Sequence, residues 1–167
     1  MGQSENLFTP DHIRLYSGTY FNPTFPDIDK IHIEDIAHGL SMHCRFGGHT
    51  KVFYSVAEHC INVSKNVFRC NRLAALLHDA SEAYLYDVPK PIKVNLIGYS
   101  EMEDNIMRLI SQKFGFEYPL NNDVKSADMT LLSLEWEKLV INEPKISVLS
   151  QGEAKSEFLR LFHSYSA

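Results

Sequence analysis

The pattern of hydrophobic and polar residues changes once along the chain, from alternation to helical periodicity. Residues 13–16 and 19–22 alternate on either side of Ser17-Gly18, which is typical of two short strands joined by a tight turn. After a Pro-containing stretch that ends at Asp29, hydrophobic residues recur at intervals of three and four, the spacing of one helix face. The sequence therefore predicts an all-α protein with a small N-terminal β hairpin at about residues 13–22.

Capping residues and glycines set the expected helix boundaries. Ser55 and Glu58 have the spacing of a capping box, in which each side chain accepts a hydrogen bond from a free amide of the helix start, and Ser100 and Glu103 repeat it. Gly residues are expected to end two of the helices, and an irregular segment should follow Pro89. The predicted helices cover residues 33–45, 55–69, 71–84, 100–115, 122–140 and 153–163.

Length and cysteine usage favour one domain over residues 1–167. A chain of this size buries enough surface to be stable without disulfides or a structural metal, and it contains no repeat or long linker. Its three cysteines lack the C-x-x-C spacing of a thiolate zinc site, so we expect small buried thiols at these positions. They are Cys44, Cys60 and Cys70. A metal in this protein would therefore be suspected of a chemical role.

Net charge and the chain ends narrow the partners. Lys and Arg number 16 against 21 Asp and Glu, a formal charge of -5 that disfavours duplex nucleic acid but permits a small anionic ligand. No stretch reaches the ~20 apolar residues of a membrane helix. The first ten residues lack the basic and apolar regions of a secretory signal. We expect a cytoplasmic protein without a membrane partner.

Four potential metal ligands lie on three of the predicted helices. His59 is on the second helix, His78 and Asp79 are on the apolar third, and the neighbours of Asp128 turn its carboxylate toward the core. Buried carboxylates must be paired or bound to a cation, and one divalent ion could satisfy all four residues. Two imidazoles and two carboxylates suit Mn, Fe, Co, Ni or Zn without distinguishing among them. The alternative is that each residue separately caps, pairs or faces solvent.

Six segments around these residues form a wider pattern: IEDIAH at 33–38, RFGGHT at 45–50, SVAEH at 55–59, HDASE at 78–82, DVPKPIK at 87–93 and KSAD at 125–128. In this order they resemble the HD-domain phosphohydrolases. Within that family the sequence is most similar to the bacterial 5′-deoxyribonucleotidases and their phage and prophage relatives, over residues 13–140, with the HD core at about 33–140. The resemblance implies an HD-domain helical bundle in which His59, His78, Asp79 and Asp128 bind the metal.

Two further carboxylates are candidates for catalysis. On a continuous helix Glu82 would project from the same face as His78 and Asp79, where it could take a proton from a metal-bound water. A solvated surface glutamate is the alternative, and the resemblance of HDASE to the family favours the catalytic role. Asp87 resembles a second catalytic carboxylate of the deoxyribonucleotidases, although Asp is also common in turns.

A phosphate ligand would need cationic donors close to the metal. Arg45 is the best candidate, because a guanidinium can make bidentate contacts with phosphoryl oxygens. The deoxyribonucleotidases have an Arg-Trp pair here that contacts phosphate and helps to reject ribose. Phe46 keeps the apolar wall but lacks the indole N–H, so ribose discrimination stays open. His49, Lys90 and Lys93 could contact phosphate or simply be solvated.

These observations predict a metal-dependent nucleotide phosphohydrolase. The expected reaction converts a deoxynucleoside 5′-monophosphate to deoxynucleoside and phosphate. Because the sequence has no P-loop motif, phosphoryl transfer from ATP is not expected. One alternative is a deoxynucleoside triphosphate triphosphohydrolase that releases triphosphate. Others are a nucleotide-binding regulatory module with an inactive metal site, and an all-α interaction protein. The family resemblance also suggests a homodimer or a higher homo-oligomer.

Overall fold

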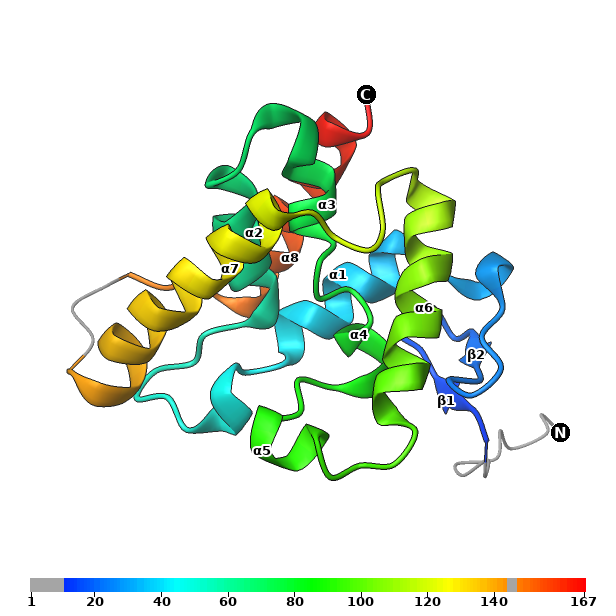
Figure 1. Cartoon of the computed structure of the whole chain (residues 1–167), viewed down its shortest axis with the longest axis horizontal. Helices are drawn as coiled ribbons and strands as arrows, with labels where there is room; N and C mark the ends of the chain where they lie inside the picture. The colour runs from blue at the N-terminus through cyan, green and yellow to red at the C-terminus, as the bar shows by residue number, and fades with distance from the viewer. Residues whose placement is uncertain (1–10, 144–146) are drawn as a thin grey trace, which may run out of the picture.

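The computed structural model describes residues 11–143 and 147–167, which form a helical protein with one small hairpin (Figure 1). Strands β1 (Ile13–Arg14) and β2 (Tyr20–Phe21) pair antiparallel, with Ile13 opposite Phe21. The turn between them is closed by a hydrogen bond from the Gly18 amide to the Leu15 carbonyl, at 3.0 Å. The predicted all-α class with an N-terminal hairpin is confirmed.

The main core lies between helices from the two ends of the sequence. In Figure 1, α1 (Ile33–Met42) crosses the centre of the molecule, and α2 (Val56–Lys65) lies near the C-terminal α8 (Gln151–Tyr165). Fully buried side chains from these helices include Leu40, Ile61 and Phe158. Burial of this apolar surface, at roughly 25 cal/mol per Å², is the main source of stability. The core fixes α2, which carries His59.

The first helix ends three residues before the predicted boundary, because the next residues form extended pairs instead. The Arg45 amide donates to the Tyr54 carbonyl at 2.9 Å, and the Val56 amide donates to the His43 carbonyl at 3.0 Å. A short 3-10 turn, η1 (Ile28–Lys30), precedes α1, and a second, η2 (Phe46–Gly48), lies in the loop between the paired residues. The bridge holds the chain before η2 against the start of α2.

The predicted third helix over residues 71–84 is wrong as a single element. A 3-10 turn, η3 (Arg69–Asn71), leads into α3 (Arg72–Leu76), residues 77–81 form turns, and α4 (Glu82–Leu85) follows. The apolar pattern that predicted burial is nevertheless correct, since Leu76 and Leu77 are fully buried. His78 and Asp79 therefore lie in a turn between two short helices, where their side chains are not restricted to one helix face.

Helix α6 (Tyr99–Phe114) ends at Gly115 as predicted and starts within one residue of the prediction, but the predicted capping box of Ser100 and Glu103 does not form. Gly98, in the left-handed conformation with φ of 80°, precedes the helix, and the Glu103 carboxylate accepts from Lys93 instead of capping. The segment after Pro89, predicted as irregular, forms a short helix, α5 (Lys90–Lys93).

Helix α7 (Asn122–Glu135) continues into a π-helical turn, η4 (Trp136–Ile141), over the predicted range. The N-terminus of α8 has a complete capping box from Ser150 and Glu153. At α2 only half of the predicted box forms: Ser55 accepts from the Glu58 amide, but the Glu58 carboxylate accepts from the Leu149 amide.

The cysteines and membrane prediction can be compared directly with the structure. All three cysteines are free, as predicted, and Cys60 is buried; the prediction of burial is wrong for Cys70, which is exposed. Within residues 11–143 and 147–167, no helix has the length and apolar character needed to cross a membrane. The prediction about a secretory signal concerns residues 1–10, which lie outside the described residues.

Candidate metal centre

The four predicted ligands come together where α2, the 77–81 turn and α7 meet. The His59 Nε2 atom lies 3.1 Å from Asp128 Oδ1 and 3.8 Å from Asp79 Oδ2. The His78 Nε2 atom lies 3.2 Å from Asp79 Oδ2 and 3.7 Å from Asp128 Oδ1. Both imidazoles are buried, whereas the carboxylates are partly accessible. The predicted grouping of these residues is thus present in the structure.

The hydrogen bonds on the far side of each imidazole set its preferred tautomer. His78 Nδ1 lies 2.8 Å from the Ala75 carbonyl, which can only accept, so Nδ1 carries the hydrogen. His59 Nδ1 lies 2.9 Å from a carboxylate oxygen of Glu135, which favours the same assignment. In the neutral rings both Nε2 lone pairs then face carboxylate oxygens, an unfavourable arrangement unless a cation or a second proton lies between them.

The charges within the cluster stabilise one another strongly. Burial alone would raise the pKa of Asp79, but the adjacent imidazoles and a guanidinium hold it well below its usual range. Asp128 also has a lowered pKa, because its contact with His59 and the positive charges of both imidazoles outweigh its burial. Burial would lower the pKa of His78, yet Asp79 and the other anionic neighbours raise it well above its usual value. The site therefore holds both carboxylates ionised and favours positive charge between them.

These residues fit a divalent cation. One ligand atom from each of His59, His78 and Asp128 lies within 4.8 Å of the others. His78 Nε2 is buried and has no hydrogen-bond partner among the described residues, as expected for an atom that binds a metal. Cys60 forms a second such group with His78 and Asp79, but burial raises the pKa of its thiol to about 11, which disfavours a thiolate ligand.

Glu82 is buried next to the cluster, although not by the continuous helix that the sequence predicted. It begins α4, and its amide donates to the Asp79 carbonyl at 2.9 Å, so a turn brings it close to the ligands. Its Oε2 atom is buried without a hydrogen-bond partner in the described chain. Burial, together with the negative charges of Asp79 and Asp87, raises the pKa of Glu82 well above its usual value. This carboxylate is therefore a proton acceptor with an unusually high affinity for protons.

Arg45 and Asp87 complete the charged part of the site. Arg45 is only 6% exposed, and its Nη1 atom lies 3.6 Å from Asp79 Oδ2. The Nε atom lies 3.1 Å from Glu135 Oε2 without hydrogen-bond geometry, so this contact is an ion pair. Asp87 is half-buried, and burial raises its pKa while the charge of Arg45 opposes the increase. The structure thus places the predicted Arg45 guanidinium beside the candidate metal ligands.

Aromatic rings lie next to Arg45 at the surface. The Arg45 guanidinium carbon is 5.3 Å from the centroid of the Phe46 ring. Phe46 in turn makes an edge contact with Trp136, which is 48% exposed, at a centroid distance of 5.6 Å. The φ angles of Phe46 and Tyr86 are 57° and 66°, values that non-glycine residues rarely adopt. Both strained residues directly adjoin charged residues of the site, as is common at functional positions.

The remaining predicted substrate residues are placed less centrally. Lys93 is half-buried and its Nζ atom is 2.6 Å from Glu103 Oε1, an ion pair that the sequence did not predict. The positive charge of Lys93 also opposes, but does not cancel, the increase in the pKa of Glu82. His49 and Lys90 are exposed, and among the described residues neither side chain forms a hydrogen bond or an ion pair with the cluster.

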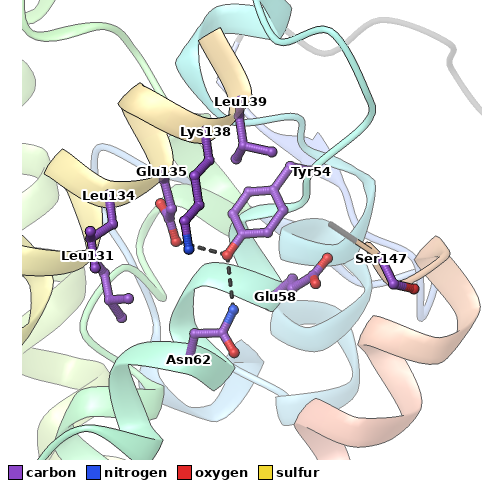
Figure 2. Close-up of a pocket in the computed structure, with 9 residues that line it drawn as sticks. All are labelled: Tyr54, Glu58, Asn62, Leu131, Leu134, Glu135, Lys138, Leu139 and Ser147. Carbon is purple, nitrogen blue, oxygen red and sulfur yellow. Dashed lines mark hydrogen bonds between the residues drawn. The ribbon is translucent and has the colours of Figure 1, made fainter. Parts of the chain in front are cut away.

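Glu135 is a central residue that the sequence analysis missed. It is 6% exposed, and its carboxylate accepts from the Tyr54 hydroxyl at 2.7 Å and from His59 Nδ1 at 2.9 Å. Figure 2 shows Glu135 and Tyr54 meeting beside Asn62, whose side-chain amide donates to the Tyr54 hydroxyl at 2.9 Å. Only the seven-residue spacing from Asp128, two helical turns along α7, could have indicated this position.

The fold and the site define a helical protein with a buried His/Asp cluster that could hold a divalent metal. No family model matches the chain. It is 36% identical over 149 residues to the uncharacterized protein YfdR of Escherichia coli K12, covering 89% of this chain and 84% of YfdR. An uncharacterized protein of Rhodobacter capsulatus is 37% identical over 140 residues, covering 75% of this chain and 71% of that relative. The chain belongs to the YfdR family.

Proposed function

We propose that this protein is an HD-domain phosphohydrolase that uses a divalent metal to hydrolyse deoxynucleoside 5′-monophosphates. The observation that carries the proposal is the arrangement of two imidazole Nε2 atoms against two carboxylates, 3.1 to 3.8 Å apart. An ion held by His59, His78, Asp79 and Asp128 would supply positive charge for a phosphoryl group and lower the pKa of a water molecule.

The protein groups around the cluster suit the other requirements of phosphate ester hydrolysis. Water attacks phosphorus, the P–O5′ bond breaks, and the leaving oxygen takes up a proton, giving deoxynucleoside and orthophosphate. Glu82 accepts the proton of the attacking water, a role that its raised pKa supports. Arg45 donates to the phosphoryl oxygens, where charge must be stabilised. Asp87 is a second candidate for proton transfer because it is half-buried near Glu82.

The test is a substrate panel assayed with Mn²⁺, Co²⁺ and Zn²⁺ separately. Ribo and deoxy forms of mono-, di- and triphosphates are incubated with the protein, and both orthophosphate and tripolyphosphate are quantified. We expect orthophosphate from deoxynucleoside monophosphates. Tripolyphosphate from deoxynucleoside triphosphates would replace this proposal with triphosphohydrolase activity, and nucleotide binding without hydrolysis would replace it with a regulatory role.

Two variants separate metal binding from catalysis. Glu82→Ala should retain the metal and lose turnover, because Glu82 is absent from the group of close ligand atoms. Asp79→Ala should lose both, since its carboxylate lies against both imidazoles. Full turnover by Glu82→Ala would remove this residue from the mechanism, and absence of metal from the wild-type protein would refute the proposed centre.

A further inference from the structure

Glu135 contacts three side chains that lie between residues 45 and 59. Its Oε1 atom lies 2.7 Å from the Tyr54 hydroxyl and 2.9 Å from His59 Nδ1, while Oε2 lies 3.0 Å from that same nitrogen. Oε2 is also 3.1 Å from Arg45 Nε. The carboxylate lies at the last residue of α7, two turns after Asp128. One buried anion therefore contacts both a candidate metal ligand, His59, and the candidate phosphate-binding residue, Arg45.

We propose that Glu135 is a positioning residue that fixes His59 for metal binding and Arg45 for phosphate binding. This inference rests on the metal centre of the proposed function. As an acceptor, Glu135 holds the hydrogen of His59 on Nδ1 and leaves the Nε2 lone pair facing Asp128 and the metal position. A carboxylate in this place also makes the imidazole a stronger ligand.

The second carboxylate oxygen orients Arg45. The ion pair between Glu135 Oε2 and Arg45 Nε holds one edge of the guanidinium. The Nη1 atom of the same guanidinium lies 3.6 Å from Asp79 Oδ2. Because Arg45 is 6% exposed, the guanidinium has little freedom to leave this position. Neutralising Glu135 would remove the anion that keeps Arg45 beside the metal ligands. The two functions of the site are consequently linked through one side chain.

Tyr54 and Asn62 extend the hydrogen-bond network of Glu135. The Asn62 amide donates to the Tyr54 hydroxyl, which donates to Glu135, and all three residues border the same pocket (Figure 2). Burial and the negative charge of Glu135 raise the pKa of the Tyr54 hydroxyl, which therefore remains a hydrogen-bond donor. These two hydrogen bonds restrain the Glu135 carboxylate, which also contacts His59 and Arg45.

The first measurement is metal affinity, obtained by titrating Co²⁺ into metal-free protein in competition with a chromophoric chelator. We expect Glu135→Gln to bind Co²⁺ about 10–100-fold more weakly than wild type, the usual effect of losing such a partner. Glu137→Gln is the matched control, since it removes the same charge from an exposed residue two positions away. An affinity for Glu135→Gln within twofold of this control would overturn the inference.

Two conservative variants keep the test valid if Glu135→Gln does not fold. Glu135→Asp retains the charge but withdraws the carboxylate by one carbon, and Tyr54→Phe retains the charge and loses one hydrogen bond. Both should weaken Co²⁺ binding, and Tyr54→Phe by less than about tenfold, because one neutral hydrogen bond is lost. Wild-type affinity in both folded variants would contradict the positioning role.

Phosphate binding tests the link to Arg45. At saturating Co²⁺, inorganic phosphate should bind Glu135→Gln more weakly than Glu137→Gln, by at least about fivefold, because the ion pair is charge-assisted. Equal phosphate affinities would overturn the link. If wild type binds Co²⁺ but hydrolyses no nucleotide, the proposed function fails while the affinity comparison still decides the role of Glu135. If wild type binds no Co²⁺, both proposals fail.

Discussion

Replacing Glu82 with glutamine should make the metal-free protein more stable and the metal-loaded protein inactive. Glu82 is 7% exposed, and its Oε2 atom has no hydrogen-bond partner within the described chain. A buried polar group without a partner costs about 1–3 kcal/mol, and more when it is charged. Gln has nearly the same shape and carries no charge, so the substitution removes the additional cost of burying the charge, while the cost of a buried polar group remains.

The pH dependence of the difference follows from the direction of the pKa shift. Burial raises the pKa of Glu82 in the folded protein above the value of about 4.3 in an unfolded chain. Between these two pKa values the folded state binds more protons, so wild-type stability falls by up to about 1.4 kcal/mol per pH unit from this residue. Below the unfolded pKa both states are protonated and the penalty disappears. The advantage of Glu82→Gln should therefore grow as pH rises from 4 to 8.

The assay is thermal unfolding in a chelating buffer at pH 4 and pH 8. An advantage of about 1–3 kcal/mol at pH 8 corresponds to an increase in Tm of roughly 2–12 °C for a chain of this size. Glu137→Gln, at an exposed position, should remain within about 0.5 kcal/mol of wild type. With Co²⁺ and substrate, Glu82→Gln should lose turnover by about 10²–10⁴-fold. A variant no more stable than wild type at pH 8, or one that remains fully active, would refute this reasoning.

Three further predictions concern the metal, the helix packing and the aromatic pair Phe46–Trp136. Co²⁺ at about 1,000 times its Kd should stabilise the protein by about 4 kcal/mol, or roughly 8–16 °C in Tm, and His78→Ala should abolish the increase in a thermal scan. Gly39→Ala should lower Tm by about 2–4 °C, because the new Cβ would lie 3.1 Å from Ala83 Cα. Gly152→Ala, which has open space around its Cβ, should instead raise Tm. Changes in Tm of the same sign in both variants would contradict this packing argument. Trp136 is the single tryptophan of the chain, so its fluorescence reports on the Phe46–Trp136 pair. A deoxynucleoside monophosphate that binds metal-loaded Glu82→Gln should change this fluorescence more than inorganic phosphate does. An unchanged fluorescence would place the nucleoside away from the pair.

Local sequence determined much of the helical architecture and the identity of the proposed ligands. Alternation around Ser17-Gly18 and the periodicity that follows are local properties, and they predicted the hairpin and most of the helices correctly. The ligands could be selected because polar residues in apolar segments need partners when buried. His59 and His78 are buried, and they meet Asp128 as predicted.

Tertiary structure decided how these elements and side chains combine. The break at residues 77–81 interrupts a segment with continuous helical periodicity, and it places His78 and Asp79 in a turn instead of on a helix face. Glu103 has the spacing of a cap, but its carboxylate pairs with Lys93 from another element. For Glu103, an ion pair with a residue ten positions earlier outweighed a local capping preference of about 1 kcal/mol.

Glu135 shows most clearly what local sequence could not determine. It follows Leu134 and precedes Trp136 near the end of a helix, a position where most glutamates face solvent. Its burial depends on Tyr54, His59 and Arg45, which lie 76 to 90 positions earlier in the chain. The sequence supplies the residues for the centre, but only the packing of α7 against α2 and the chain before it brings this carboxylate to the imidazole and the guanidinium, because such contacts carry no periodic signal along the chain.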